Sequence, residues 1–266
     1  MGKALVIEGL QVSNPLCVIT IGENTPERVL ASYLSVNKSI SENEKTALKA
    51  MVGTFIDNGL WYKIKVLLPI CGSSASDMLI DAVNPRETII ADASRYSVDD
   101  NKLKFASSYD SSDIGTFANE ISSTNLSIYY GYKIVSAGNG KALYLENDSN
   151  QSIALEAIDG GYNQPSISVD DTIIKASTSL IDKNRILCAK IEVSNMSLYC
   201  NNQLLIEGTC SINDSKLIRI KHFSVSSAAS DMLATFMCMA NGLTSNEEII
   251  VYNAIDTFLT TIGKRA

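Results

Sequence analysis

The sequence predicts a mainly β protein, an antiparallel β-sandwich with two or three flanking helices. From Met78 to about Ser230, short segments rich in Ile, Val, Leu, Thr and Tyr alternate with clusters of Asp, Asn, Gly and Ser. Such spacing is typical of a sandwich or barrel. Helical patterns with strong start signals stand before and after this region. The 266 residues suit one such domain with a small additional element.

Residues 1–59 are expected to form strands and helices that pack on the sandwich or lead into it. Residues 1–22 predict two short strands, and Pro26 suits a helix start. Ser41 and Glu44 have the spacing of a capping box, in which each side chain bonds the other residue's backbone N–H. Apolar residues then recur at helical spacing, and Asn58-Gly59 should end this helix.

Residues 60–266 are expected to form the sandwich and a C-terminal helix. The run LWYKIKVLLPI predicts a buried strand that stops near Pro69, and Asn201-Asn202 suits a hairpin turn. The segment RILCAKIEV alternates so that one face should be open to solvent. Thr244-Ser245-Asn246-Glu247 is a second capping box, and Lys264-Arg265 should complement the dipole of the helix that follows it. We expect the helices to close the open ends of the sandwich.

Composition excludes several classes of partner. The net charge is −7 and Lys and Arg do not cluster, which argues against a nucleic-acid partner. No window approaches the roughly 18 apolar residues of a membrane helix. The apolar run Ala4–Ile7 is too short for a secretory signal. We therefore expect no membrane partner and initial residence in the cytoplasm of the producing cell.

Six cysteines and one histidine offer no metal or redox motif. No C-x-x-C pair occurs, and one histidine cannot complete a zinc finger of known spacing. Buried, reduced thiols are expected, with a Cys200–Cys210 disulfide across the hairpin as an alternative. Candidate calcium donors occur at 146–148, at Asp110 and Asp113, and at 170–171, but none has EF-hand spacing. We predict no cofactor and no metal ligand.

No catalytic constellation is recognisable. His222 lies in a run of weak alternation, so it cannot be assigned to the inside or the outside of a strand. The Glu-x-Asp-x-x-Glu string of some sandwich glycosidases does not occur. Asp99-Asp100 and Asp170-Asp171 are adjacent pairs, typical of turns, and on a strand they would face opposite sides. We therefore predict no catalytic residue.

Exposed aromatic rings are candidates for contact with a sugar or a protein. The densest cluster is Tyr129-Tyr130-Gly131-Tyr132, in which Tyr130 and Tyr132 would share one face of a strand. Tyr162 lies in a Gly-Gly-Tyr-Asn loop. Core and cross-strand packing is the alternative interpretation of these tyrosines. Tyr130, Tyr132 and Tyr162 remain the candidate surface residues.

Three strings carry a resemblance to a known group. MGKALVIEG, LWYKIKVLLPICGSSASDMLIDAVNPR and GLTSNEEIIVYNAIDTFLTTIGKR together resemble virion structural proteins of tailed, crAss-like phages. The order of the last third also resembles the end of a concanavalin-like (laminin-G-like) sandwich, a jelly roll. The group's Asn-Gly turn is replaced here by Asn201-Asn202, and Asp81–Arg86 only approximates its Asn-x-x-x-Pro-Arg segment. The motifs are loop and packing features, so no catalytic residue carries over.

The resemblance implies a non-enzymatic virion component, a head or tail fibre or a capsid decoration subunit. Such a protein would act as a homo-oligomer that contacts other virion proteins and binds bacterial surface glycan weakly at many sites. A purely structural cement or adaptor protein is the alternative, and a polysaccharide-degrading enzyme is a third. Localisation in the virion, after assembly in the host cytoplasm, is the corresponding expectation.

Overall fold

The computed structural model describes residues 24–85, 93–105, 120–134, 140–159, 164–177, 184–222 and 232–265. The two strands expected within residues 1–22 lie outside this part of the chain. None of the helices in the described ranges combines the length and the apolarity that crossing a bilayer requires.

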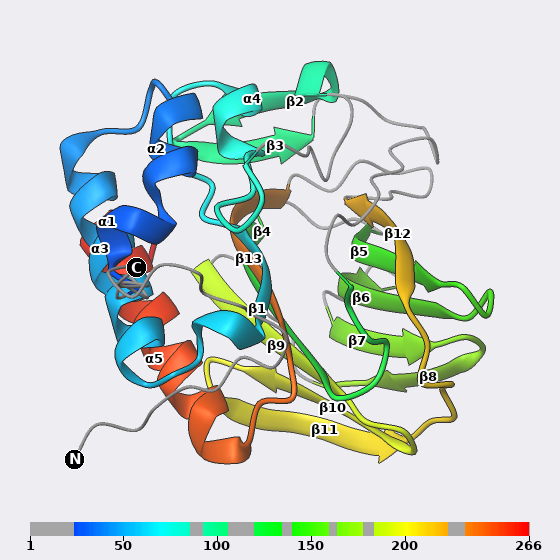
Figure 1. The fold of residues 1–266 in the computed structure, drawn as a ribbon. Helices are drawn as coiled ribbons and strands as arrows, with labels where there is room; N and C mark the ends of the chain where they lie inside the picture. The colour runs from blue at the N-terminus through cyan, green and yellow to red at the C-terminus, as the bar shows by residue number, and fades with distance from the viewer. Residues whose placement is uncertain are drawn as a thin grey trace, which may run out of the picture.

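Two antiparallel sheets face each other and confirm the predicted sandwich (Figure 1). The larger sheet has the order β11-β10-β9-β4-β13-β3-β2, with β1 paired to β13, and the smaller has the order β12-β5-β6-β7-β8. The strands of the larger sheet are β1 Ile64–Leu68, β2 Tyr96–Asp99, β3 Lys102–Phe105, β4 Leu126–Ile134, β9 Asn184–Ile191, β10 Asn195–Cys200, β11 Gln203–Thr209 and β13 Met232–Asn241. Those of the smaller sheet are β5 Gly140–Asn147, β6 Ser152–Asp159, β7 Gln164–Val169, β8 Thr172–Lys175 and β12 Leu217–His222.

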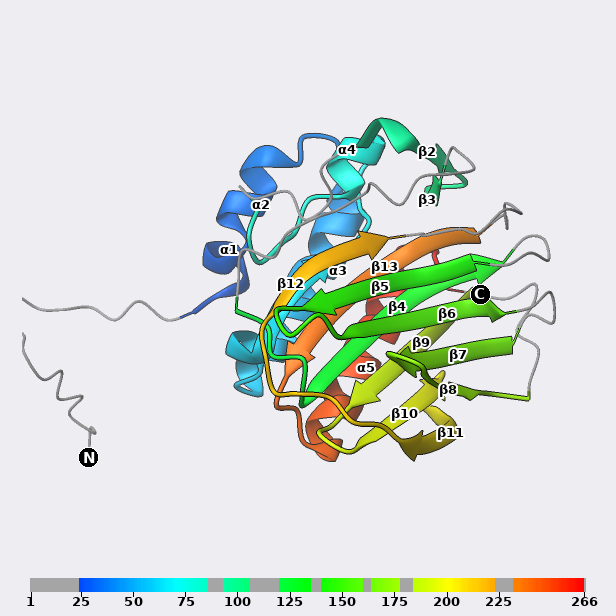
Figure 2. The ribbon, with the colours of Figure 1, turned by 90° about the vertical axis from the view of Figure 1, so that its right-hand side faces the viewer.

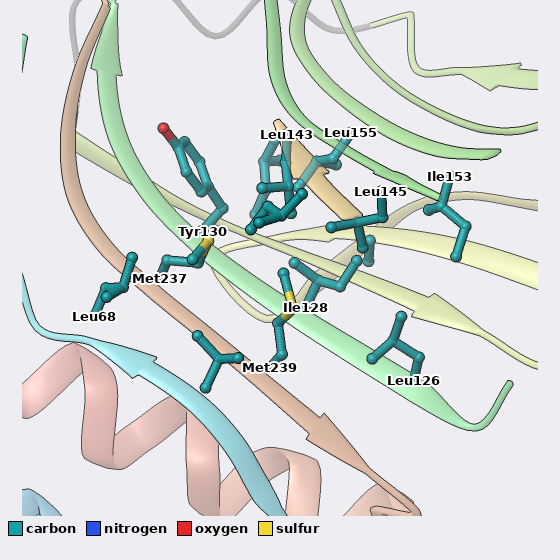
Figure 3. Close-up of a cluster of buried hydrophobic side chains, with 14 of the residues drawn as sticks. Leu68, Leu126, Ile128, Tyr130, Leu143, Leu145, Ile153, Leu155, Met237 and Met239 are labelled. Carbon is teal, nitrogen blue, oxygen red and sulfur yellow. The ribbon is translucent and has the colours of Figure 1, made fainter. Parts of the chain in front are cut away.

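The main core fills the space between the sheets. Figure 3 shows Ile128 and Tyr130 of β4 in one cluster with Leu143 and Leu145 of β5. All four side chains are buried. Each strand contributes alternate residues to this core, as the period of two requires. The predicted alternation of RILCAKIEV is confirmed for the inward face of β9, whose apolar side chains belong to this core.

Helices α1, α2, α3 and α5 form a third layer on the outer face of the larger sheet (Figures 1 and 2), whereas α4 contributes Met78 to the core between the sheets. The described helices are α1 Pro26–Val29, α2 Ala31–Val36, α3 Glu42–Asp57, α4 Ala75–Met78 and α5 Ser245–Thr261, with 3₁₀ turns at Trp61–Lys63 and Ala93–Arg95. Both predicted capping boxes are present. The expectation that the helices close the ends of the sandwich is wrong. Leu67, Phe236 and Cys238 point outward from the sheet and are buried with α3 and α5 in a second apolar cluster, which needs a covering layer.

Tight turns join several strands at the Asn-Asn and Asp-Asp pairs of the sequence. Asn201 and Asn202 both have positive φ, 50° and 61°, as a type I′ hairpin requires. Asp100 lies in the β2–β3 turn with φ 49°, and Asp170 in the β7–β8 turn with φ 50°. Asp100, Asp170 and Asp171 are therefore turn residues, as predicted, whereas Asp99 is the last residue of β2.

Lys264 and Arg265 bind other elements, and Arg265 also contacts Tyr252 and Asp256 of the helix that precedes it. The Lys264 ammonium is buried and donates to the carbonyl of Ile70, and the Arg265 guanidinium donates to Asn201 Oδ1 at 2.9 Å. These contacts tie α5 to the loop after β1 and to the β10–β11 hairpin. Complementing the dipole of α5 stays a prediction, and the structure adds these tertiary contacts to it.

All five described cysteines are free, and four of them are buried. Cys200 pairs with Gln203 beside the hairpin turn, whereas Cys210 follows Thr209, which pairs with Asn195 at the other end. Because strands rise roughly 3.3 Å per residue, these two cysteines lie too far apart for a disulfide. The disulfide alternative is therefore wrong.

Candidate functional site

Two of the three predicted surface tyrosines lie in the interior. Tyr130 and Tyr132 are 0% exposed, and their ring centroids lie 6.1 Å apart in the core between the sheets. Their shared face of β4 is the inward one, so neither ring can contact a sugar, and the surface prediction is wrong for both. Tyr162 lies outside the described residues. Tyr129, on the opposite face of β4, points toward the helix layer as alternation requires.

A cavity of about 250 Å³ lies between α5 and the outer face of the larger sheet. Its floor is a cross-strand row, because Tyr129 pairs in register with Cys188 and Cys188 with Tyr199. Three tyrosines, one carboxylate and two other polar side chains take part in its wall. The lining residues are Tyr129, Cys188, Tyr199, Asn202, Ser245, Glu248, Ile249 and Tyr252. We call this cavity the tyrosine pocket.

Helix α5 supplies the roof of the tyrosine pocket. Ser245, Glu248, Ile249 and Tyr252 follow one another at spacings of three, one and three, so they share one face of the helix. The Thr244 capping box fixes where this helix begins, and with it the position of that face over the strands. Ser245 and Ile249 are exposed, so the mouth of the pocket opens toward solvent on the α5 side.

Glu248 is held by hydrogen bonds from the sheet below it. Its Oε1 accepts from Ser127 Oγ at 3.1 Å and lies 3.5 Å from Lys190 Nζ, while its backbone carbonyl accepts from Tyr129 OH at 3.4 Å. The described chain places no hydrogen bond on Oε2. One carboxylate oxygen is thus anchored, and the other is a spare acceptor beside the pocket.

Lys190 occupies the face of β9 that the sequence predicted to be open to solvent. Helix α5 covers it there, and its Nζ lies 3.3 Å from Glu192 Oε1 and 3.5 Å from Glu248 Oε1. Burial alone would lower the pKa of Lys190, but the two carboxylates outweigh it and raise that pKa. The ammonium therefore stays charged beneath the pocket, and the expectation of a wet face is corrected.

Burial keeps the three phenols of the pocket neutral. It raises the pKa of Tyr129 well above its ordinary value, and it also raises the pKa of Tyr199 and of Tyr252. Arg265 donates to the Tyr252 hydroxyl at 3.0 Å, which fixes that ring near the middle of α5. The pocket therefore presents neutral aromatic rings and hydroxyl groups.

Two further hollows differ in chemistry. A groove of about 410 Å³ runs between α3 and α5 and is lined mainly by small and apolar side chains, among them Ala50, Met51 and Phe258. An open hollow of about 440 Å³ at the end of the sandwich contains Glu120 and Asp214. Hydrogen bonds from Ser122 and Thr124 lower the pKa of Asp214, so its carboxyl group is ionised.

The other sequence candidates do not converge on the tyrosine pocket. His222 ends β12, a strand of the smaller sheet, whereas the pocket lies outside the larger one. Asn147 Oδ1 accepts from Ser149 N and Gln151 N and so serves a turn. Within the described ranges, His, Cys, Asp and Glu form no group of three or more that could hold a metal ion. Asp110 and Asp113 lie outside those ranges.

Sequence reasoning missed Tyr199, Glu248 and Tyr252. Alternation in the hairpin segment LYCNNQLLIEG puts Tyr199 and Leu198 on opposite faces of β10, which was a usable signal. Position along α5 puts Glu248 and Tyr252 one turn apart. What the sequence did not contain was the pairing of β4, β9 and β10 and the placement of α5 on them.

Comparisons with known proteins bear on the fold. No protein-family model matches the chain, and no curated protein matches it either. A Trypanosoma rangeli sialidase in complex with sialic acid is similar in structure at TM-score 0.50 and 13% identity, over 74% of this chain and 34% of the sialidase. A structure described as HCR/D-Sa-GBL1/C gives 0.50 at 16% identity, over 73% of this chain and 52% of that one.

The binding domain of botulinum neurotoxin DC in complex with SialylT gives a TM-score of 0.49 at 16% identity, over the same shares of the two chains, 73% and 52%. The chain therefore spans about a third of the sialidase and about half of the other two structures. At these identities the likeness extends to the fold alone. The chain is a mainly β protein whose two antiparallel sheets form a sandwich.

Proposed function

We propose that this chain is a non-enzymatic virion protein of a tailed phage, a fibre or decoration subunit that binds host-surface glycan through the tyrosine pocket. The observation that carries the binding role is the pocket itself, in which three tyrosines meet one spare carboxylate oxygen. Small-ligand sites typically combine aromatic walls with a few placed polar groups. The volume of about 250 Å³ is below the usual ~300–1,000 Å³ of drug-sized sites, which suits one ring of a glycan.

The polar groups of the pocket match a hydroxyl-rich ligand. Asn202 and Ser245 are exposed at its mouth and can donate and accept, while Glu248 Oε2 can accept. Tyrosine rings offer flat apolar surface with a polar tip, which suits a ring that is apolar on its faces and polar at its edge. This combination supports glycan as the ligand class.

The chemistry of the tyrosine pocket supports binding without catalysis. Most glycoside hydrolases need two carboxyl groups across the scissile bond, and the pocket lining contributes one, Glu248. A tyrosine nucleophile needs a lowered pKa, whereas burial raises the pKa of Tyr129 and Tyr252. We therefore expect the ligand to leave the pocket unchanged.

The virion role is supported by the sequence resemblance in the three strings quoted above. A pocket of this size would bind a single glycan weakly. Display of many copies on one particle raises the overall affinity by about 10²–10⁴-fold without new contacts. The net charge of −7 favours solubility at high local copy number.

The test combines location with binding. Antibody-labelled particles should show the chain on the head or tail, and a multimer of the purified chain should bind host cells. Tyr199→Ala should weaken cell binding at least about tenfold, because one ring of a small pocket is lost. Tyr62→Ala is the matched control, since that tyrosine is 71% exposed and lies outside the pocket. Particles that lack the chain, or equal binding by both variants, would contradict the proposal.

The groove between α3 and α5 favours the alternative of a cement or adaptor subunit. It is the apolar surface of the helix layer, the kind of patch that a neighbouring virion subunit could cover. Ala50→Glu places a charge on its exposed wall. If that variant is no longer incorporated into particles, and Tyr199→Ala has no effect on attachment, the adaptor role replaces the glycan-binding one.

A further inference from the structure

The tyrosine pocket has a distinct charge environment. Among its lining residues, Glu248 is the one with a formal charge, and its side chain is 15% exposed. A ligand in the pocket therefore meets a carboxylate and no lining cation. Any preference between neutral and anionic sugars therefore depends on whether a nearby cation can neutralise the negative charge of an anionic ligand.

Two cations contact lining residues of the pocket, Lys190 beside Glu248 and Arg265 beside Tyr252, and both are already paired with carboxylates. Lys190 Nζ lies between the carboxylates of Glu192 and Glu248, so one positive charge has to neutralise two negative charges. Arg265 is paired with Asp256 and donates as well to the carbonyl of Asn184, to Asn201 Oδ1 and to Tyr252 OH. The lysine group carries a net charge of −1 and the arginine pair is neutral.

An anionic ligand would consequently lie next to the excess negative charge of the group formed by Lys190, Glu192 and Glu248. Inside a half-buried site, two like charges a few ångströms apart repel far more strongly than in open water. Hydroxyl groups, by contrast, can donate to Glu248 Oε2 and exchange hydrogen bonds with Ser245 and Asn202. The same carboxylate that repels an anion thus holds a neutral ring.

We propose that the tyrosine pocket selects an uncharged sugar ring and rejects sugars that carry a carboxylate, sialic acid included. This inference rests on the proposed glycan-binding function and names the ligand class of that site. The uncharged ligand proposed here differs from the ligands of two structurally similar proteins, whose structures contain sialic acid and SialylT.

Matched pairs of sugars test the inference directly. We would titrate the full chain with oligosaccharides that end in glucose or galactose, and with counterparts that end in glucuronic or galacturonic acid. A third pair would be lactose and its sialylated form. In each pair we expect the neutral member to bind at least about tenfold more tightly. The ring is shared within the first two pairs, so the difference reports charge.

Three variants assign the effect to this site. Glu248→Gln keeps an acceptor for Ser127 and removes the charge, so the neutral-to-anionic ratio should fall at least about threefold. Glu192→Gln removes a negative charge outside the lining and should lower the ratio in the same direction, which covers the case in which Glu248→Gln misfolds. Tyr199→Ala should weaken every sugar that binds, whereas Tyr62→Ala should weaken none.

The outcomes separate the inference from the function on which it rests. Equal or tighter binding of the anionic members, lost in Tyr199→Ala, would overturn the charge selection and leave glycan binding in place. An unchanged ratio in both glutamine variants would also overturn it. If no sugar of either kind binds and Tyr199→Ala still attaches to host cells like the wild type, the proposed function fails together with the inference.

Discussion

Asp81 gives the structure a pH dependence that can be measured directly. The side chain is 2% exposed, and its Oδ1 accepts from the backbone N–H of Leu67 at 2.9 Å and of Val83 at 3.0 Å. Burial raises the pKa of Asp81 from 3.8 to about 7, and the backbone hydrogen bonds lower it only in part. Between those two pH values the folded chain therefore holds a proton that the unfolded chain has lost.

The direction in which stability changes with pH follows from the proton held by the folded state. Because the folded state binds more protons in this window, the free energy of unfolding falls as pH rises from about 4 to about 7 and then levels off. The gap between 3.8 and about 7, at about 1.4 kcal/mol per pH unit, gives a contribution of about 4 kcal/mol. The stabilising contribution is complete below pH 4 and absent above pH 7.

Asp81→Asn isolates this contribution. The amide oxygen can keep the two hydrogen bonds to Leu67 and Val83, but the group no longer titrates. At pH 4.5 we expect the variant to be about 1 kcal/mol less stable than the wild type, since the amide replaces one acceptor by a donor. At pH 7.5 we expect it to be up to about 3 kcal/mol more stable.

Urea unfolding of both proteins at four pH values between 4.5 and 7.5 measures the difference. Asp171→Asn is the control, because that carboxylate is exposed in the β7–β8 turn and its variant should track the wild type. Asp81→Ala should be less stable than Asp81→Asn at every pH, since it leaves the N–H groups of Leu67 and Val83 unpaired. A difference between wild type and Asp81→Asn that does not change with pH would refute the reasoning.

Three more predictions concern packing, capping and thiols. Gly131→Ala should lower the free energy of unfolding by about 1–3 kcal/mol in thermal unfolding, because its Cβ would lie 2.5 Å from Thr235 Oγ1 and 3.3 Å from Phe236 N; an unchanged melting temperature would contradict this. Thr244→Ala should cost about 1 kcal/mol through the loss of the α5 cap, measured by denaturant unfolding, and Thr244→Ser should restore most of it. Of the five described cysteines, Cys210 alone should be alkylated by iodoacetamide in the native state, as mapped by mass spectrometry, because the other four are buried.

Local signals in the sequence predicted the elements well. The capping boxes that begin α3 and α5 and the Asn201-Asn202 turn depend on residues a few positions apart, so no tertiary knowledge was needed. The weak alternation near His222 also has a structural cause. A register shift between Leu217 and Arg219 in β12 lets both Leu217 and Ile220 face the core.

One sequence pattern did indicate that a layer of helices covers the larger sheet. Strand β13 has the sequence MLATFMCMAN, an apolar run without alternation, and such runs are typical of strands buried on both faces. Phe236 and Cys238 are the residues that required a cover. The tyrosine pocket could not be derived in this way, since Tyr129, Tyr199 and Tyr252 meet only once strand order and helix docking are known.

The central claim is that a glycan binds between α5 and the larger sheet. The most direct test is a ¹³C-tyrosine spectrum of the full chain during titration with a neutral oligosaccharide that binds. The chain has 11 tyrosines, and we predict that the signals of Tyr129, Tyr199 and Tyr252 shift while that of exposed Tyr62 does not. Shifts confined to tyrosines outside the pocket, such as Tyr62, Tyr144 or Tyr162, would contradict the account and place the binding surface elsewhere.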